Sequence, residues 1–150
     1  MAESLPTRIE LELVTPERPV VRGDVISVSL PGKEGYLGIL PGHAPLLSEL
    51  KPGELSYTQD DATHYVAVSW GFAEVLPDRV IVLVHTSERA EEIDRERAQR
   101  ARQRAEERLG KISDTKIDRE RAQAALERAM ARLEAAGKMS NSRSGGFTPP

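Results

Sequence analysis

Residues 80–99 read VIVLVHTSERAEEIDRERAQ, and within this stretch the sequence changes from the pattern of a strand to that of a helix. Its first five residues, Val80–Val84, form a continuous apolar run that is typical of a strand covered on both faces. After His85 the chain consists mostly of alanine, arginine, glutamate and glutamine, which favour helices. The stretch therefore predicts a β-rich N-terminal part and a helical C-terminal part that join near residue 86.

The residues before this stretch alternate between apolar and polar side chains with a period of two. Ile9, Leu11 and Leu13 are separated by glutamates, and the segments 26–30 and 66–70 repeat the alternation. Turn-forming pairs separate these runs, namely Pro31-Gly32, Pro41-Gly42, Pro52-Gly53, Asp60-Asp61 and Pro77-Asp78. Short strands at this spacing predict a β-sandwich or barrel.

The residues after this stretch contain the same seven-residue string twice. Ile93–Gln99 (IDRERAQ) returns unchanged as Ile117–Gln123. In each copy the aspartate is suited to cap the first backbone N–H groups of a helix, and the isoleucine before it can pack on the following alanine as a hydrophobic staple. The repeat therefore predicts two helices that begin in the same way.

Both predicted helices carry an apolar seam made mostly of alanine. Gly110 and Gly137 are plausible helix ends, and the short link between the helices predicts an antiparallel hairpin. Alanine removes little apolar area from water, so we expect a marginally packed hairpin that can open and re-dock. The sequence thus predicts an α+β fold: an N-terminal β-sandwich of about ten short strands (1–86), a C-terminal two-helix hairpin (87–137) and a disordered tail (138–150).

The composition excludes several classes of function. There is no cysteine, and the histidines His43, His64 and His85 are not at metal-ligand spacing, so we expect no disulfide and no metal site. No nucleophile elbow or phosphate-binding glycine loop is present, so we expect no catalytic residue. The dense charges of the back half are balanced, which argues against a nucleic-acid binder. We see no secretion signal or membrane-spanning run and expect a soluble protein.

The densest local motif is the segment 35–47, which reads GYLGILPGHAPLL. It combines apolar side chains with glycine and proline and ends in a stiff Pro-containing stretch. One interpretation is a tight corner of the sandwich, and the other is a preformed loop that presents a docking surface. The spacing of the residues alone leaves both open.

Three segments together resemble a known family. The runs EGYLGILPGHAPLLSELKPGEL (34–55), WGFAEVLPDRVIVLV (70–84) and TSERAEEIDRERA (86–98) are similar to the epsilon subunit of F-type ATP synthases, and the resemblance extends over about residues 7–136. It implies a non-catalytic subunit of the central stalk that couples rotation during proton-driven ATP synthesis. It also implies contacts with the gamma subunit and the c-ring, and with the alpha and beta subunits when the helices are extended to block ATP hydrolysis. The implied location is peripheral, at the cytoplasmic face of the cell inner membrane, with the membrane reached only through the complex.

The resemblance assigns a ring-facing surface to the glycine–proline–histidine motif. By position, the contacts with the c-ring and gamma are Tyr36, Gly38, Ile39, Pro41, Gly42 and His43. The chain departs from the family pattern at two places. Tyr36 stands where some members have an acidic residue, and Trp70 stands where glycine or a small residue is usual.

The resemblance also implies a regulatory ATP site on the folded hairpin, with no cofactor required. Several bacterial members bind ATP through a motif [Ile/Leu]-Asp-x-x-Arg-Ala, which Ile93–Ala98 matches. The implied ligand residues are Glu88, Ile93, Asp94, Arg97, Ala98, Arg104, Arg128 and Arg132. Arginines can clamp phosphates with forked donors. The simpler interpretation is that these charges form solvated helix faces and that Asp94 only caps its helix. In the second copy of the repeat, Asp118 and Arg121 are expected to serve the helix alone.

Two other classes of function fit the sequence without the resemblance. One is a stand-alone protein-binding module whose helical hairpin recognises a partner. The other is a small nucleotide-sensing protein. A tight complex with a coiled-coil gamma subunit distinguishes the stalk subunit from both.

Overall fold

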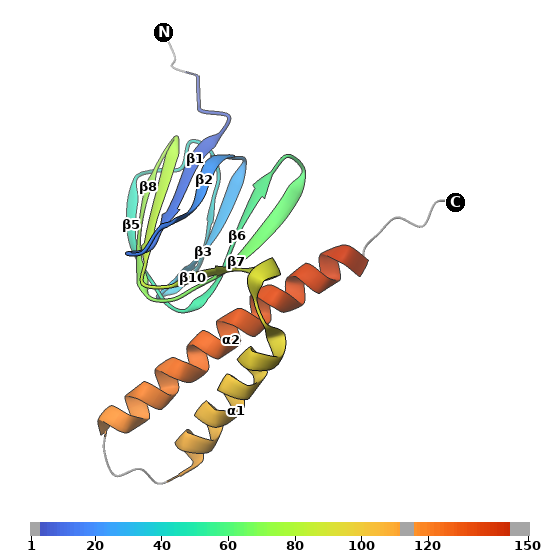
Figure 1. Ribbon diagram of the computed structural model, residues 1–150. Helices are drawn as coiled ribbons and strands as arrows, with labels where there is room; N and C mark the ends of the chain where they lie inside the picture. Colours follow the sequence, from blue (N-terminus) through green and yellow to red (C-terminus); the bar gives the residue numbers. More distant parts are fainter. Residues whose placement is uncertain (1–3, 112–115, 145–150) are drawn as a thin grey trace.

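The computed structural model describes residues 4–111 and 116–144 and consists of a β-sandwich above two long helices (Figure 1). The strands are β1 (Ile9–Val14), β2 (Pro19–Val25), β3 (Ser27–Gly32), β4 (Gly35–Ile39), β5 (Leu46–Leu50), β6 (Gly53–Gln59), β7 (Ala62–Val68), β8 (Gly71–Leu76), β9 (Arg79–Val84) and β10 (Ser87–Arg89). A 3₁₀ turn (Ala90–Glu92) leads to α1 (Arg95–Gly110) and α2 (Lys116–Ser144). The predicted fold class is confirmed.

The strands belong to one sheet that folds over on itself. Their order is β10-β7-β6-β3-β5-β8-β9-β1-β2, and β4 pairs with β3 beside this path. In the described residues the paired strands are antiparallel apart from β1 and β9, which run parallel. The helices follow β10 and lie at one end of the sandwich (Figure 1).

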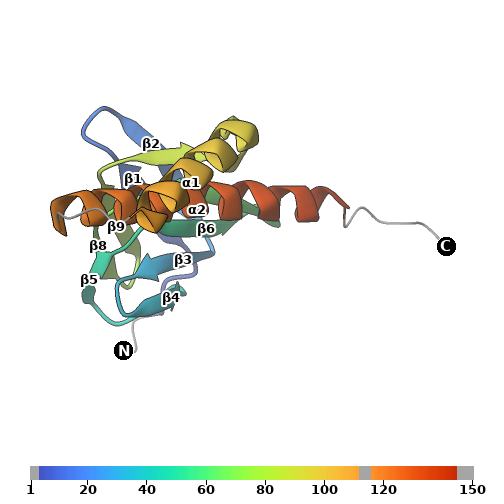
Figure 2. The same ribbon diagram turned by 90° about the horizontal axis from the view of Figure 1, so that it is seen from below.

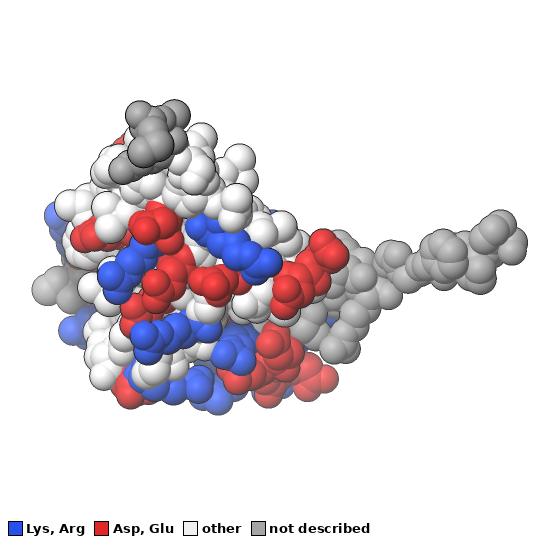
Figure 3. Space-filling view, turned by 90° about the horizontal axis from the view of Figure 1, so that it is seen from above, with Lys and Arg blue, Asp and Glu red and all other residues white. Residues whose placement is uncertain are grey.

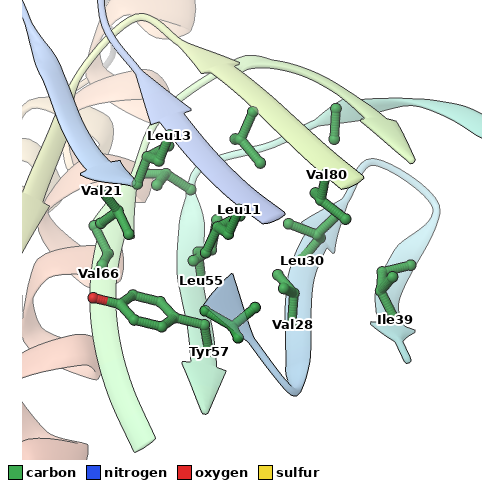
Figure 4. Packing of buried hydrophobic residues seen from close by; sticks show 14 of the residues in the cluster. Leu11, Leu13, Val21, Val28, Leu30, Ile39, Leu55, Tyr57, Val66 and Val80 are labelled. Atoms are coloured by element: carbon green, nitrogen blue, oxygen red, sulfur yellow. The ribbon is translucent and has the colours of Figure 1, made fainter. Parts of the chain in front are cut away.

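The core of the sandwich comes from the period-two alternation. Leu11 and Leu13 of β1, Leu30 of β3 and Leu55 of β6 are completely buried, and their side chains point into the same interior (Figure 4). The continuous apolar run of β9 was expected to be covered on both faces, and this is wrong. Leu83 is 54% exposed, because the helices pack below the sandwich and leave the outer face of β9 uncovered.

α2 lies across the lower end of the sandwich, against β6 and β7, with α1 beside it (Figure 2). The seam between the helices is made of alanine, as expected: Ala98 and Ala105 of α1 and Ala122 and Ala129 of α2 are buried. A second apolar cluster joins α2 to the sheet and consists of Ala67, Ala90, Ile93, Ala131, Ala135 and Ala136. Within the described residues this cluster contains a single large aliphatic side chain.

The second helix differs from the sequence prediction at both ends. α2 begins at Lys116, so Asp118 lies within its first turn instead of capping it. Gly137 does not end the helix, which continues to Ser144, so the predicted tail is helical over residues 138–144. A glycine inside a helix costs only about 1 kcal/mol relative to alanine, which the helix-favouring residues around Gly137 can offset. The side chain of Ile117 and residues 145–150 lie outside the described residues.

The surface charge is mixed on the face seen from above. Lys and Arg side chains are interspersed there with Asp and Glu side chains among the described residues (Figure 3). A nucleic-acid-binding face gathers positive charge instead.

A candidate nucleotide site between the sandwich and α2

A bidentate ion pair joins the edge of the sheet to the second helix. Arg132 Nε of α2 donates to Glu88 Oε2 of β10 at 2.7 Å, and Arg132 Nη2 donates to Glu88 Oε1 at 3.2 Å. The two side chains are 25% and 30% exposed, so the pair is partly shielded from water. A forked, partly shielded pair is stronger than a surface ion pair, and it fixes the position of α2 on β10.

This ion pair lines a cavity of about 350 Å³ between β7, β10 and the helices. Glu88, Arg128 and Arg132 supply its charged groups, and alanines of the sheet and of both helices form much of its wall. The buried Oγ of Ser87, which also lines it, has no hydrogen-bond partner among the described residues. The cavity therefore combines an apolar wall with guanidinium groups and a free hydroxyl.

Trp70 contacts the same helix from the turn between β7 and β8. The guanidinium carbon of Arg128 lies 5.8 Å from the centre of the Trp70 ring, within the range of a cation–π contact. This gives Trp70 a role that the sequence did not reveal, because the contact joins residues far apart in the chain.

The repeated heptapeptide acts as a helix start in its first copy. Asp94 Oδ1 accepts a hydrogen bond from the backbone N–H of Arg97 at 3.0 Å, so the predicted cap is confirmed. Ile93 is buried in the cluster between the sheet and α2, and Ala98 is buried at the helix seam. Both residues therefore have packing roles at this helix start.

The structure brings together some of the residues that the resemblance implies for ATP binding. Glu88, Arg128 and Arg132 meet at the cavity, whereas Ile93, Asp94 and Ala98 are used in packing and capping. The side chains of Arg97 and Arg104 are exposed on α1 and do not line this cavity.

The residues implied for the ring contact lie along β4 and in the loop after it. Tyr36, near the start of β4, accepts a hydrogen bond through its hydroxyl from the backbone N–H of Glu54 at 3.3 Å. The loop at the other end of β4 is held by the Gly42 N–H, which donates to the Pro77 carbonyl at 2.7 Å. Gly42 has a φ of +86°, which favours glycine. The Tyr36 hydroxyl lies near Lys138 and Glu134 of α2, whereas Gly42 lies beside Leu5, so these two implied contacts lie toward opposite ends of β4.

A buried charged pair was missed by sequence reasoning. Glu54 of β6 is buried, and its Oε2 lies 2.8 Å from Nζ of Lys138 on α2. No local pattern could have indicated it, because the pair depends on how α2 crosses the sheet and on α2 continuing past Gly137.

Comparison with known proteins agrees with this architecture. The family described as the beta-sandwich domain of the ATP synthase delta/epsilon chain matches residues 8–90, and the long alpha-helix domain of the same chain matches residues 91–137. The ATP synthase epsilon chain of Geotalea daltonii is 47% identical over 131 residues, which cover 87% of this chain and 95% of that protein. The epsilon chain of Koribacter versatilis is 58% identical over 100 residues, covering 67% of this chain and 70% of that protein.

A solved structure is also similar. A chain in the Euglena gracilis mitochondrial ATP synthase, in a structure of its OSCP, F1 and c-ring, superimposes with a TM-score of 0.79 and 27% identity. The match covers 89% of this chain and 84% of that one.

The sandwich followed by a helical pair, matched over nearly the whole chain, defines a non-catalytic subunit of the ATP synthase central stalk. The chain belongs to the ATP synthase epsilon chain family. This assignment replaces the two alternative interpretations of the sequence, a stand-alone binding module and a small nucleotide-sensing protein. No helix in the described residues is both long and apolar enough to cross a membrane.

Proposed function

We propose that this epsilon chain couples rotation between the c-ring and the catalytic head, and that its helices inhibit ATP hydrolysis when they leave the sandwich. The observation that supports helix release is the composition of the docking interface. The cluster under α2 holds one isoleucine and five alanines, with Tyr65 partly buried against it. Burying alanine contributes far less than the roughly 1.5–3 kcal/mol of a Leu or Ile side chain. The helices are therefore held much less firmly than the strands of the sandwich.

The proposed partners follow from the family. The sandwich binds the gamma subunit and the c-ring, and the extended helices reach the alpha and beta subunits. Leu40, in the loop after β4, is 64% exposed, and Leu47 of β5 is 74% exposed. These exposed apolar groups, in and beside the loop that joins β4 to β5, suit a protein partner. The chain is proposed to sit peripherally at the cytoplasmic face of the inner membrane, attached through the complex.

The inhibition is tested by adding the chain to an ATP synthase that lacks its epsilon subunit. The full chain is expected to lower ATP hydrolysis severalfold, and a chain that stops at Glu92 is expected to bind equally but to inhibit little. The shortened chain keeps β10, so the sheet remains complete. Equal inhibition by both chains would contradict the role of the helices, and failure of both to bind gamma would contradict the coupling role.

We also propose that ATP binds between the sandwich and the helices and stabilises the docked arrangement. Guanidinium groups of Arg128 and Arg132 suit phosphates, and the alanine-walled cavity suits an adenine ring. A ligand that binds only the docked state shifts the equilibrium toward it. ATP would thus keep the helices from the catalytic head.

Two arginines of α2 supply a matched pair of variants for the ATP site. Arg128→Ala removes a guanidinium that lines the cavity and is expected to weaken ATP binding by about tenfold, the effect of losing one charge-assisted contact. Arg121→Ala, at an exposed position two turns earlier on the same helix, is expected to leave binding unchanged. Calorimetric titration of the isolated chain at millimolar ATP measures both. The absence of saturable binding, or equal effects of the two variants, would remove the proposed site.

A further inference from the structure

The buried carboxylate of Glu54 lies beneath the far end of α2. Its side chain is 3% exposed, and Lys138 Nζ is 2.8 Å from its Oε2. Lys138 itself remains 47% exposed and also lies 3.9 Å from Glu134 Oε1, one helical turn earlier. A carboxylate on the sheet is therefore neutralised by a cation that the helix brings to it.

The burial of Glu54 depends on the docking of α2. Glu54 lies on β6, and α2 packs across β6 and β7. An ionised carboxylate is costly to bury unless a cation or hydrogen-bond donors compensate it. When α2 leaves the sheet, water can reach the carboxylate and that cost disappears. Docking of this end of the helix is therefore tied to the charge on Glu54 and to the presence of its partner.

The charged and titratable groups that face Glu54 come from two elements. On α2 they are Lys138 and Glu134, and on β4 the Tyr36 hydroxyl contributes, held by its hydrogen bond with the Glu54 N–H. Burial raises the pKa of the Glu54 carboxyl, and the attraction of Lys138 lowers that pKa only in part. The ion pair with Glu54 raises the pKa of the Lys138 ammonium.

We propose that Glu54 and Lys138 form a latch that docks the far end of α2 on β6, with Lys138 offsetting the cost of burying the carboxylate. The latch holds while the carboxylate is paired or protonated, and it opens when an ionised carboxylate loses its partner. This device acts within the chain itself. Only its consequence for ATP hydrolysis rests on the proposed function.

The latch makes docking depend on pH in a defined direction. Burial raises the Glu54 pKa in the docked state, and release of α2 would expose the carboxyl to water, so the docked state should bind its proton more tightly. Protonation of Glu54 therefore favours docking, and this contribution is complete below the ordinary carboxyl pKa of about 4.3. It is lost as the pH rises through the raised pKa of the docked state.

The test measures docking in the full chain with a pair of spin labels. The sequence has no cysteine, so Glu74→Cys on β8 and Met130→Cys on α2 introduce unique attachment points on exposed side chains. Lys138→Met is expected to lower the docking equilibrium constant at least tenfold at neutral pH. Glu54→Gln is expected to dock at least as well as the parent chain, and Glu54→Gln combined with Lys138→Met should restore docking.

Lys116→Met, an exposed lysine at the other end of the same helix, is the control and should leave docking unchanged. Acidification from about pH 8 to about pH 4, below the ordinary carboxyl pKa of about 4.3, should strengthen docking of the parent chain and not of Glu54→Gln. Parent-like docking of Lys138→Met, or a double variant as weakly docked as Lys138→Met, would overturn the latch. Neither outcome bears on binding to gamma, so the latch and the proposed function fail separately.

Discussion

Replacement of Gly71 by alanine is expected to destabilise the sandwich by about 3 kcal/mol or more. Gly71 begins β8, directly opposite Val84 of β9. A Cβ built on Gly71 would overlap the carbonyl oxygen of Leu83 and lie 2.8 Å from the Cα of Val84. These are backbone atoms, so no side-chain rotation can relieve the clash. The β8–β9 pair, or the turn that leads into it, has to move.

The measurement is urea unfolding of the full chain, with Gly38→Ala as the matched control. Gly38 also lies in a strand, and nothing is within 4 Å of a Cβ built there, so its substitution is expected to change the free energy of unfolding by no more than about 0.5 kcal/mol. Equal stability of the two variants would show that the sheet can open at β8 without cost. Because Gly71 follows Trp70 directly, a shift there would also disturb the contact of Trp70 with Arg128.

The fold was predictable where the signal is local. The alternation around Leu11 places one face of β1 in the core, and the side chain of Asp94 caps the helix that follows it. The predictions were wrong where the structure of a residue depends on contacts with distant parts of the chain. The exposure of Leu83 depends on where the helices pack, and the extension of α2 beyond Gly137 is accompanied by the pairing of Lys138 with Glu54.

The candidate site was predictable only in part, for the same physical reason. Glu88 and Arg132 were selected because the chain resembles a family, and the structure brings them together although they are far apart in sequence. Spacing within either segment indicates only exposed charges on a strand edge and a helix face. The contact of Trp70 with Arg128 and the pair of Glu54 with Lys138 had no sequence signal. Side chains of these types need no partner while they are in water, and a buried charge needs one only once the fold encloses it.

The Glu88–Arg132 pair allows docking of the helices to be separated from binding of ATP. Arg132→Glu places two carboxylates where the ion pair now lies, and juxtaposed like charges cost several kcal/mol. We expect the docking equilibrium constant, measured with the same spin labels, to fall by about a hundredfold, or about 2.7 kcal/mol. Arg121→Glu, on an exposed part of α2, should leave docking unchanged.

The charge-swapped chain, Glu88→Arg with Arg132→Glu, then distinguishes the two roles of Arg132. The swap restores opposite charges across β10 and α2, so docking should recover to within about tenfold of the parent chain. ATP binding should remain weak, because the guanidinium has moved from the helix to the sheet edge and no longer stands beside Arg128. A swapped chain that binds ATP like the parent would show that the position of this charge does not matter to the nucleotide. A swapped chain that stays undocked would show that the forked geometry of Arg132 on α2, and not charge pairing alone, holds the helix.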